Sequence, residues 1–253
     1  MGKIIAITNQ KGGVGKTTTC INLCCALTMR GKRVLLCDMD PQGNGTSGMG
    51  IEKNRLKAGV YQVLIGEKKA EEVIVHTKYG DVMPSNAALA GAGIELVGIE
   101  GREYILKQAL EKIRDRYDYI YIDCPPSLEL LTLNALCACD GILIPVQCEY
   151  FALEGLSDLI ATMKAVKKRL NPGIEIDGVL LTMFDGRTNF SYQVAGEVKR
   201  YFRDKVYRVV IPRNVRLSEA PSHGKPVLFY DRSSKGAEAY RQLAEEIVSA
   251  ERR

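Results

Sequence analysis

The sequence contains no tryptophan, only two histidines, and no apolar run that approaches the length of a membrane span. A membrane-spanning helix needs about 20 consecutive apolar residues, and the N-terminal apolar run at residues 4–7 is too short for a signal peptide. The two histidines, His76 and His223, lie far apart in the sequence and offer neither zinc-ligand spacing nor an evident catalytic dyad. These absences predict a cytoplasmic protein that does not contact a membrane.

Two further absences concern domain organisation. No internal repeat, low-complexity tract or interdomain linker divides the 253 residues, and this length suits one domain with a sizeable core. Only ten residues precede Lys11, which leaves no room for an N-terminal helix-turn-helix domain. We therefore expect residues 1–253 to form a single domain.

The sequence does contain a phosphate-binding pattern. Residues 11–18 read KGGVGKTT and follow an apolar run, which is the order of a buried strand, a glycine loop and a helix start. Glycines let the backbone curl so that its N–H groups point at phosphates, and the helix N-terminus adds further donors. We expect Lys16 to reach the β- and γ-phosphates and the Thr17 hydroxyl to ligate Mg²⁺. The expected nucleotide-binding residues of the loop are Lys11, Gly12, Gly13, Val14, Gly15, Lys16, Thr17 and Thr18.

This loop departs from the standard form at two positions. Gln10 stands where the usual first glycine would be, and a second lysine, Lys11, begins the loop. Such a deviant P-loop indicates a nucleotide-driven switch that works as a dimer.

Acidic residues follow two other expected strands. One strand leads to Asp38 and Asp40, and the other leads to Asp123 in the arrangement of a Walker B acid. Carboxylates at the carboxyl ends of parallel strands meet at the edge where ligands bind. We expect Thr17, Asp40 and Asp123 to form the metal site, with Asp40 also orienting the attacking water and Asp38 supporting either the metal or the loop. A plain polar turn is the alternative interpretation of the segment that contains Asp38 and Asp40.

With these elements in place, the chain resembles the ParA/Soj family of chromosome- and plasmid-partitioning ATPases, and within it the chromosomal Soj type. The resemblance covers essentially the whole chain. It rests on KGGVGKTT at 11–18, DMDPQ at 38–42 and DCPPS at 123–127, and it extends through the segments at 144–149, 178–183 and 211–221.

The resemblance implies a fold, a reaction and partners. The fold is a single P-loop NTPase domain of the α/β class, with a mostly parallel twisted sheet and helices on both faces. The reaction is the hydrolysis of ATP with Mg²⁺, slow for the protein alone and faster with a ParB-type (Spo0J) centromere-binding partner. The ATP-bound form is a homodimer that binds non-specific double-stranded DNA of the nucleoid during chromosome or plasmid partitioning.

The resemblance also implies roles for particular residues. Lys11 reaches across the dimer to the partner's phosphates, Gly12 packs where the two protomers meet, and Asp40 positions the hydrolytic water. The expected catalytic set is therefore Lys11, Lys16 and Asp40. The expected contacts to the adenine end of the nucleotide are Met183, Pro212, Arg213 and Asn214.

Two relatives with the same kind of loop remain as alternatives. One is a membrane-surface ATPase like MinD, although the apolar stripe of the expected last helix, residues 235–250, suits docking on the domain better than membrane binding. The other is an iron–sulfur carrier, because the chain has eight cysteines. None of them forms a C-x₂-C pair, so we expect reduced, buried thiols. Cys124, next to Asp123, is the most exposed candidate for nucleotide-linked chemistry.

The positive charge is concentrated in one segment. The net charge is +5, and residues 199–216 hold seven Lys and Arg side chains against a single acid, Asp204, while the rest of the chain sums to −1. Clustered basic residues neutralise phosphates without recognising sequence, which predicts salt-sensitive, non-specific DNA binding. A solvated helix face is the alternative. The expected DNA contacts are Arg187, Lys199, Arg200, Arg203, Arg213 and Arg216.

Strands that alternate with helices predict a largely parallel sheet covered on both faces. Residues 43–100 are the least informative part, and we expect the glycine-rich residues 43–50 to form a mobile loop. The expected strands are 4–7, 33–37, 81–83, 117–122, 141–146, 178–182 and 207–211, and the expected helices are 16–29, 103–115, 128–137, 153–170, 190–202 and 235–250.

Overall fold

A computed structural model describes residues 1–149 and 152–250 of the chain. In this part of the chain, seven strands form one sheet in the order β3-β4-β2-β5-β1-β6-β7, and all neighbours are parallel except β3 and β4. The expected α/β fold with a mostly parallel sheet is confirmed. The strands are β1 Lys3–Ile7, β2 Val34–Asp38, β3 Val75–Thr77, β4 Gly80–Met83, β5 Tyr119–Asp123, β6 Gly141–Gln147 and β7 Glu175–Thr182.

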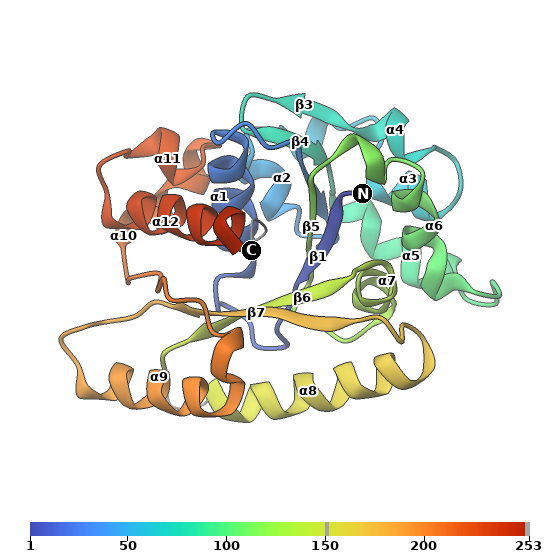
Figure 1. Cartoon of the computed structure of the whole chain (residues 1–253). Coiled ribbons are helices and arrows are strands. Elements are labelled where there is room, and N and C mark those ends of the chain that lie inside the picture. The colour runs from blue at the N-terminus through green and yellow to red at the C-terminus, as the bar shows by residue number, and fades with distance from the viewer. Residues whose placement is uncertain (150–151, 251–253) are drawn as a thin grey trace.

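Helices cover both faces of the sheet, as Figure 1 shows. One apolar core lies between the sheet and the helices that include α3 and α6–α9, and the other lies between the sheet and the helices that include α1 and α10–α12. The α-helices are α1 Lys16–Thr28, α2 Asn44–Gly48, α3 Val60–Leu64, α4 Ala70–Val73, α5 Ala92–Glu95, α6 Ile105–Glu111, α7 Leu130–Ala138, α8 Ala152–Arg169, α9 Asn189–Phe202, α10 Val215–Glu219, α11 Val227–Tyr230 and α12 Lys235–Ala250. The short 3₁₀ helices are Lys53–Arg55, Ala87–Gly91, Arg102–Tyr104, Arg114–Arg116, Arg203–Lys205 and Ala220–His223.

The strand register aligns Asp38 and Asp123 with the end of β1, where the glycine loop begins. In the parallel pairs, Ile7 of β1 lies opposite Asp123 of β5, and Asp123 lies opposite Asp38 of β2. Because these three strands are adjacent and all run in the same direction, their carboxyl ends form one edge of the sheet, where the glycine loop follows Ile7. The central strands are buried on both faces, as expected for continuous apolar runs in a parallel sheet.

Three expectations about secondary structure were wrong or incomplete. Residues 207–211 form no strand, because the N–H groups of Arg208 and Val209 donate to the side chain of Glu246 on α12. Isolated bridges occur only on either side of this segment, at Val206 and Pro212, within residues 152–250. The helix expected at 103–115 is divided into a 3₁₀ turn, α6 and a second 3₁₀ turn. The glycine-rich residues 43–50 include the helix α2, which packs on α1 instead of forming an extended loop.

Within residues 1–149 and 152–250, no helix combines the length and apolar character that a membrane crossing requires.

Candidate functional site

The glycine loop connects β1 to α1 and presents unpaired backbone donors. Gly13 and Gly15 have positive φ angles of 75° and 91°, a conformation that glycine adopts without the strain of a side chain. Gly15 is also the N-cap of α1, and neither a side-chain cap nor an acidic residue occupies the first turn of this helix. The first N–H groups of α1 therefore remain available for an anion, which is the geometry of a phosphate site.

The two lysines of the loop are in different environments. Lys16 is buried, and its ammonium donates to the backbone oxygen of Lys11 at 3.1 Å. Burial lowers the pKa of Lys16, while the negative charge of Asp123 and other nearby acids opposes this shift. The Lys11 side chain is 31% exposed and lies 3.9 Å from the carboxylate of Glu149. Lys16 thus points into its own site, whereas Lys11 lies at the surface.

Asp123 ends β5 as a fully buried carboxylate, and both of its oxygens lack a hydrogen-bond partner among the residues that the structure describes. Burial raises its pKa well above the usual range, the neighbouring charge of Asp38 raises it further, and the nearby Thr17 hydroxyl and Lys16 ammonium lower it. A buried carboxylate with free oxygens beside a threonine hydroxyl fits the oxygen ligands that Mg²⁺ prefers. Thr17 and Asp123 therefore lie close together, and a Mg²⁺ site formed by Thr17, Asp40 and Asp123 stays a prediction.

Asp38 has a different role from Asp123. Its Oδ2 accepts hydrogen bonds from the backbone N–H and the hydroxyl of Thr46, both at 2.7 Å, and its Oδ1 accepts from the N–H of Asp40 at 3.2 Å. Burial raises the pKa of Asp38 to about 6, although these hydrogen bonds oppose the shift. Asp38 could support either the metal or the loop, and its hydrogen bonds to Asp40 and Thr46 are those of a residue that supports the loop. Asp40 is partly exposed, and its Oδ1 accepts the N–H of Gln42 at 2.9 Å.

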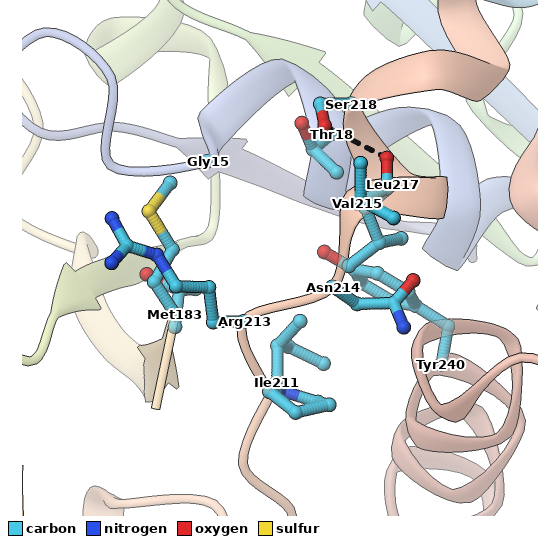
Figure 2. Close-up of a pocket in the computed structure, with 12 residues that line it drawn as sticks. Gly15, Thr18, Met183, Ile211, Arg213, Asn214, Val215, Leu217, Ser218 and Tyr240 are labelled. Atoms are coloured by element: carbon cyan, nitrogen blue, oxygen red, sulfur yellow. Dashed lines mark hydrogen bonds between the residues drawn. The ribbon is translucent and has the colours of Figure 1, made fainter. Parts of the chain in front are cut away.

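A cavity of about 450 Å³ opens beside the glycine loop. Met183 and Arg213 approach it from the segments that follow β7 and precede α10, with Asn214 nearby (Figure 2). The segments meet because Phe184 N–H donates to the oxygen of Ile211 and Arg213 N–H donates to the oxygen of Phe184. All four residues expected at the adenine end of the nucleotide line this cavity, together with Gly15 and Thr18 of the loop.

Several lining residues were not found from the sequence. Thr182 ends β7, and its hydroxyl donates to the oxygen of Val14 at 2.8 Å, so it fixes the loop. The rule that polar residues at strand ends line the site would have found it. Tyr240 comes from α12 and shares a 3.1 Å hydrogen bond with Thr19, and no local pattern marks it. The other unexpected lining residues are Ile211, Val215, Leu217 and Ser218.

The six expected DNA-contact residues do not form one patch. Arg187 precedes α9 and Arg213 pairs with the segment after β7, so both lie near the nucleotide edge, as does Arg216 at the start of α10. Lys199, Arg200 and Arg203 lie at the other end of α9, a 14-residue helix that is about 20 Å long.

Three of these arginines also have acidic neighbours within the chain. Arg187 forms two hydrogen bonds with Asp185, and this contact lowers the pKa of Asp185. Arg200 pairs with Glu197, and Arg216 pairs with Glu219 and Asp231. All three arginines are exposed, and exposed ion pairs contribute little to stability, about 0–1 kcal/mol. Phosphates can therefore compete for these side chains.

All eight cysteines are buried and unpaired. Cys124 is only 1% exposed, so the expectation that it would be the most accessible thiol was wrong. Cys124 directly follows β5. Burial raises the pKa of its thiol well above the ordinary value. Among the described residues, no three or more His, Cys, Asp or Glu side chains are grouped so that they could hold a metal ion.

The chain is similar in sequence to a known protein family and to several curated proteins. Residues 2–176 match the model of a family described as an AAA domain. The chain is 61% identical to the sporulation initiation inhibitor protein Soj of Bacillus subtilis, an alignment that covers 98% of this chain and 99% of that protein. It is 52% identical to the chromosome partitioning protein ParA of Myxococcus xanthus, over 98% of this chain and 88% of that protein.

Comparison with solved structures gives the same fold. The chain is similar to the cobyrinic acid a,c-diamide synthase of Mycobacterium smegmatis, whose crystal structure contains an ATP analogue and magnesium. The TM-score is 0.86 at 38% sequence identity, and the match covers 98% of this chain and 95% of that chain.

Proposed function

The chain belongs to the Soj/ParA family of chromosome-partitioning ATPases, and we propose that ATP switches it from a monomer to a homodimer that binds non-specific DNA. The chain is an ATPase that uses ATP and Mg²⁺. The proposal adds the dimer, the DNA and a ParB-type partner that stimulates hydrolysis. The proposed location is the cytoplasm, where the ATP-bound form associates with the nucleoid.

The observation that carries the proposal is the contrast between the two lysines. Lys16 is buried and turned into its own loop, whereas the Lys11 side chain is 31% exposed and its ammonium lies 3.9 Å from the carboxylate of Glu149. A lysine at the surface beside a phosphate loop can reach the phosphates of a second copy, as an arginine finger supplied in trans does. The γ-phosphate then favours the dimer over the monomer.

Gly12 supports the same interpretation. A Cβ built on Gly12 meets no other atom within 4 Å in the part of the chain that the structure describes, and its φ angle does not require glycine. The packing of one protomer therefore gives no reason for glycine at this position. Close approach of a second protomer gives one, because a side chain would separate the two loops.

The chain's own residues can be assigned to the reaction. Thr17 and Asp123 would hold Mg²⁺, which neutralises charge on the phosphate oxygens when it is bound. Lys16 and the N–H groups of the loop bind the phosphates, and Asp40, which is partly exposed, orients the attacking water. The cavity lined by Met183 and Arg213 receives the adenine end of the nucleotide.

DNA binding would follow from the nucleotide state through avidity. Arg187, Arg213 and Arg216 lie near the nucleotide edge, so dimerisation at that edge would bring two such groups together. Two linked weak sites bind the same polymer much more tightly than either site alone. Because the contacts are to phosphates, the affinity should fall steeply with salt.

The test measures binding to a non-specific DNA duplex at low and moderate salt, without nucleotide, with ADP, and with ATP and Mg²⁺. Asp40→Ala serves as the hydrolysis-blocked form and Gly12→Val as the dimer-blocked form. Molar mass is measured by light scattering in the same nucleotide states. We expect Asp40→Ala to be dimeric and DNA-bound with ATP, and Gly12→Val to be monomeric and unbound.

Two results would contradict the proposal. Binding of Gly12→Val to DNA at the wild-type level would show that DNA contact does not need the dimer. Absence of DNA binding in every state at low salt would leave the basic segments as solvated faces. A lipid-vesicle assay run alongside would then test the membrane-surface alternative.

A further inference from the structure

A buried hydrogen-bond network lies beneath Asp40. Its members are Asp38 on β2, Thr46 on α2 and Ser85 after β4, with exposures of 0%, 0% and 1%. The Thr46 hydroxyl donates to Asp38 at 2.7 Å and accepts the N–H of Ser85 at 2.8 Å. The Thr46 backbone N–H also donates to Asp38 at 2.7 Å. Thr46 therefore joins three separate elements in the interior.

This network contacts Asp40 on both sides of its backbone. The Asp40 N–H donates to Asp38 at 3.2 Å, and the Asp40 oxygen accepts the Ser85 hydroxyl at 2.8 Å. The side chain of Asp40 accepts the N–H of Gln42 at 2.9 Å. The direction of the Asp40 carboxylate thus depends on a backbone that the buried network fixes.

Two glycines permit the close approach that the network needs. A Cβ on Gly43 would lie 2.7 Å from the oxygen of Ser85, and Gly43 has a positive φ of 59°. A Cβ on Gly45 would lie 3.0 Å from Asp38 Oδ2 and 3.3 Å from Asp123 Oδ2. The absence of a side chain therefore lets Gly43 approach the backbone of Ser85 and lets Gly45 approach both carboxylates.

We infer that Thr46 and Ser85 are positioning residues for ATP hydrolysis: they hold the backbone of Asp40 so that its carboxylate meets the attacking water. The inference rests on the proposed role of Asp40. Neither residue lines the cavity or belongs to the phosphate loop, so the inference gives them no direct contact with the nucleotide. A displacement of about 1 Å in a catalytic group can lower a rate by about 100-fold, so the network should affect turnover more than binding.

The experiment compares Thr46→Val, Thr46→Ser and Ser85→Ala. Valine keeps the shape of threonine and its backbone donor but removes the hydroxyl, whereas serine keeps the hydroxyl. Phosphate release is measured with saturating ATP, Mg²⁺ and DNA, and KM for ATP and ATP-dependent dimerisation are measured separately. We expect kcat to fall at least about tenfold in Thr46→Val, with KM and dimerisation within twofold, and Thr46→Ser to retain most of the activity.

A stability control is needed because Thr46→Val leaves the Ser85 N–H unpaired. Asn171→Ala is the matched variant, since the buried Asn171 amide donates to the oxygens of Leu136 and Cys139 far from the site. It should lower the melting temperature and leave kcat within twofold of wild type. Ser85→Ala removes only the bond to Asp40 and keeps the test decisive if Thr46→Val does not fold.

The outcomes separate this inference from the proposed function. Wild-type kcat in Ser85→Ala and Thr46→Val, with Asp40→Ala inactive, would overturn the inference and leave the role of Asp40 intact. Activity in Asp40→Ala would overturn both. A proportional loss of kcat and dimerisation in Thr46→Val would also overturn the inference, because it would mark a general structural defect.

Discussion

Asp123→Asn should stabilise the nucleotide-free protein while it removes nucleotide-dependent stabilisation. The Asp123 carboxylate is fully buried, its two oxygens lack a hydrogen-bond partner within residues 1–149 and 152–250, and the nearby Asp38 carboxylate repels it. The Thr17 hydroxyl and the Lys16 ammonium offset only part of this, because the pKa of Asp123 is still raised. A buried charge that is incompletely compensated destabilises a folded protein, and relieving such a defect at a functional site commonly gains about 0.5–2 kcal/mol. The neutral amide has nearly the same shape and removes the charge without leaving a cavity.

The expected size can be stated as a melting temperature. A gain of about 1–2 kcal/mol corresponds to a rise of about 2–8 °C for a domain of this size. The assay is thermal unfolding at pH 8, followed by circular dichroism without nucleotide and then with ATP and Mg²⁺. Ligand at 100 times its dissociation constant stabilises by about 2.7 kcal/mol, so wild type should gain several degrees from the ligand and Asp123→Asn should not.

The pH dependence of this difference has a defined sign. The folded-state pKa of Asp123 is raised above the unfolded value, so the folded state holds the proton more tightly. Stability from this group is therefore fully present below the unfolded pKa and declines as the pH rises towards the folded pKa. The advantage of Asp123→Asn should be larger at pH 8 than at pH 5 and should disappear towards pH 4.

A partly exposed aspartate, Asp118, provides a control in which the pKa shift has the opposite sign. Asp118 accepts the backbone N–H and guanidinium of Arg33, and these hydrogen bonds lower its pKa. Asp118→Asn should therefore leave the melting temperature at pH 8 unchanged or lower it slightly. If Asp123→Asn melts below wild type at pH 8 without nucleotide, then its carboxylate carries a stabilising interaction and the reasoning is wrong.

Three other predictions concern packing and chemistry away from Asp123. Gly48→Ala should lower the free energy of unfolding in urea by about 1–3 kcal/mol, because its Cβ would collide with Ile21; an unchanged midpoint would contradict this. Arg203→Gly should raise the melting temperature by about 2–4 °C, because Arg203 has a φ of 50°; the exposed Arg200→Gly, inside α9, should lower it. Iodoacetamide at pH 7.5 should label native thiols far more slowly than unfolded ones, because burial raises the pKa of both Cys137 and Cys148 to about 11; rapid labelling of either, detected by mass spectrometry, would refute this.

The phosphate half of the site could be predicted from sequence because it is built at the ends of single strands. The order of apolar run, glycines and helix start puts backbone donors at the sheet edge without help from distant residues. The same holds for Asp123, because a polar residue that ends a buried parallel strand must lie at that edge. Its buried, unpartnered oxygens are a tertiary property that the pattern does not contain.

Other parts of the molecule depend on contacts between distant segments. The expected strand at 207–211 fails because Glu246, on the last helix, accepts two of its N–H groups. The expected mobile loop at 43–50 is ordered because Thr46 donates to Asp38 and Gly48 fits against Ile21. In both cases a local composition typical of strand or loop is overruled by partners that are remote in sequence.

The basic segment shows how a linear pattern can mislead about a surface. Residues 199–216 are contiguous in sequence, but α9 and the segment after it run along the domain, so Arg203 and Arg216 lie at opposite ends. Only the group at the nucleotide edge lies beside the loop where a second protomer would dock. If the proposed ATP-dependent DNA binding occurs, we expect it to depend mainly on Arg187, Arg213 and Arg216, and we expect Lys199 and Arg203 to add attraction that does not depend on nucleotide. Both ends of the segment carry basic residues, and the distance of each end from the glycine loop decides whether those residues can respond to nucleotide.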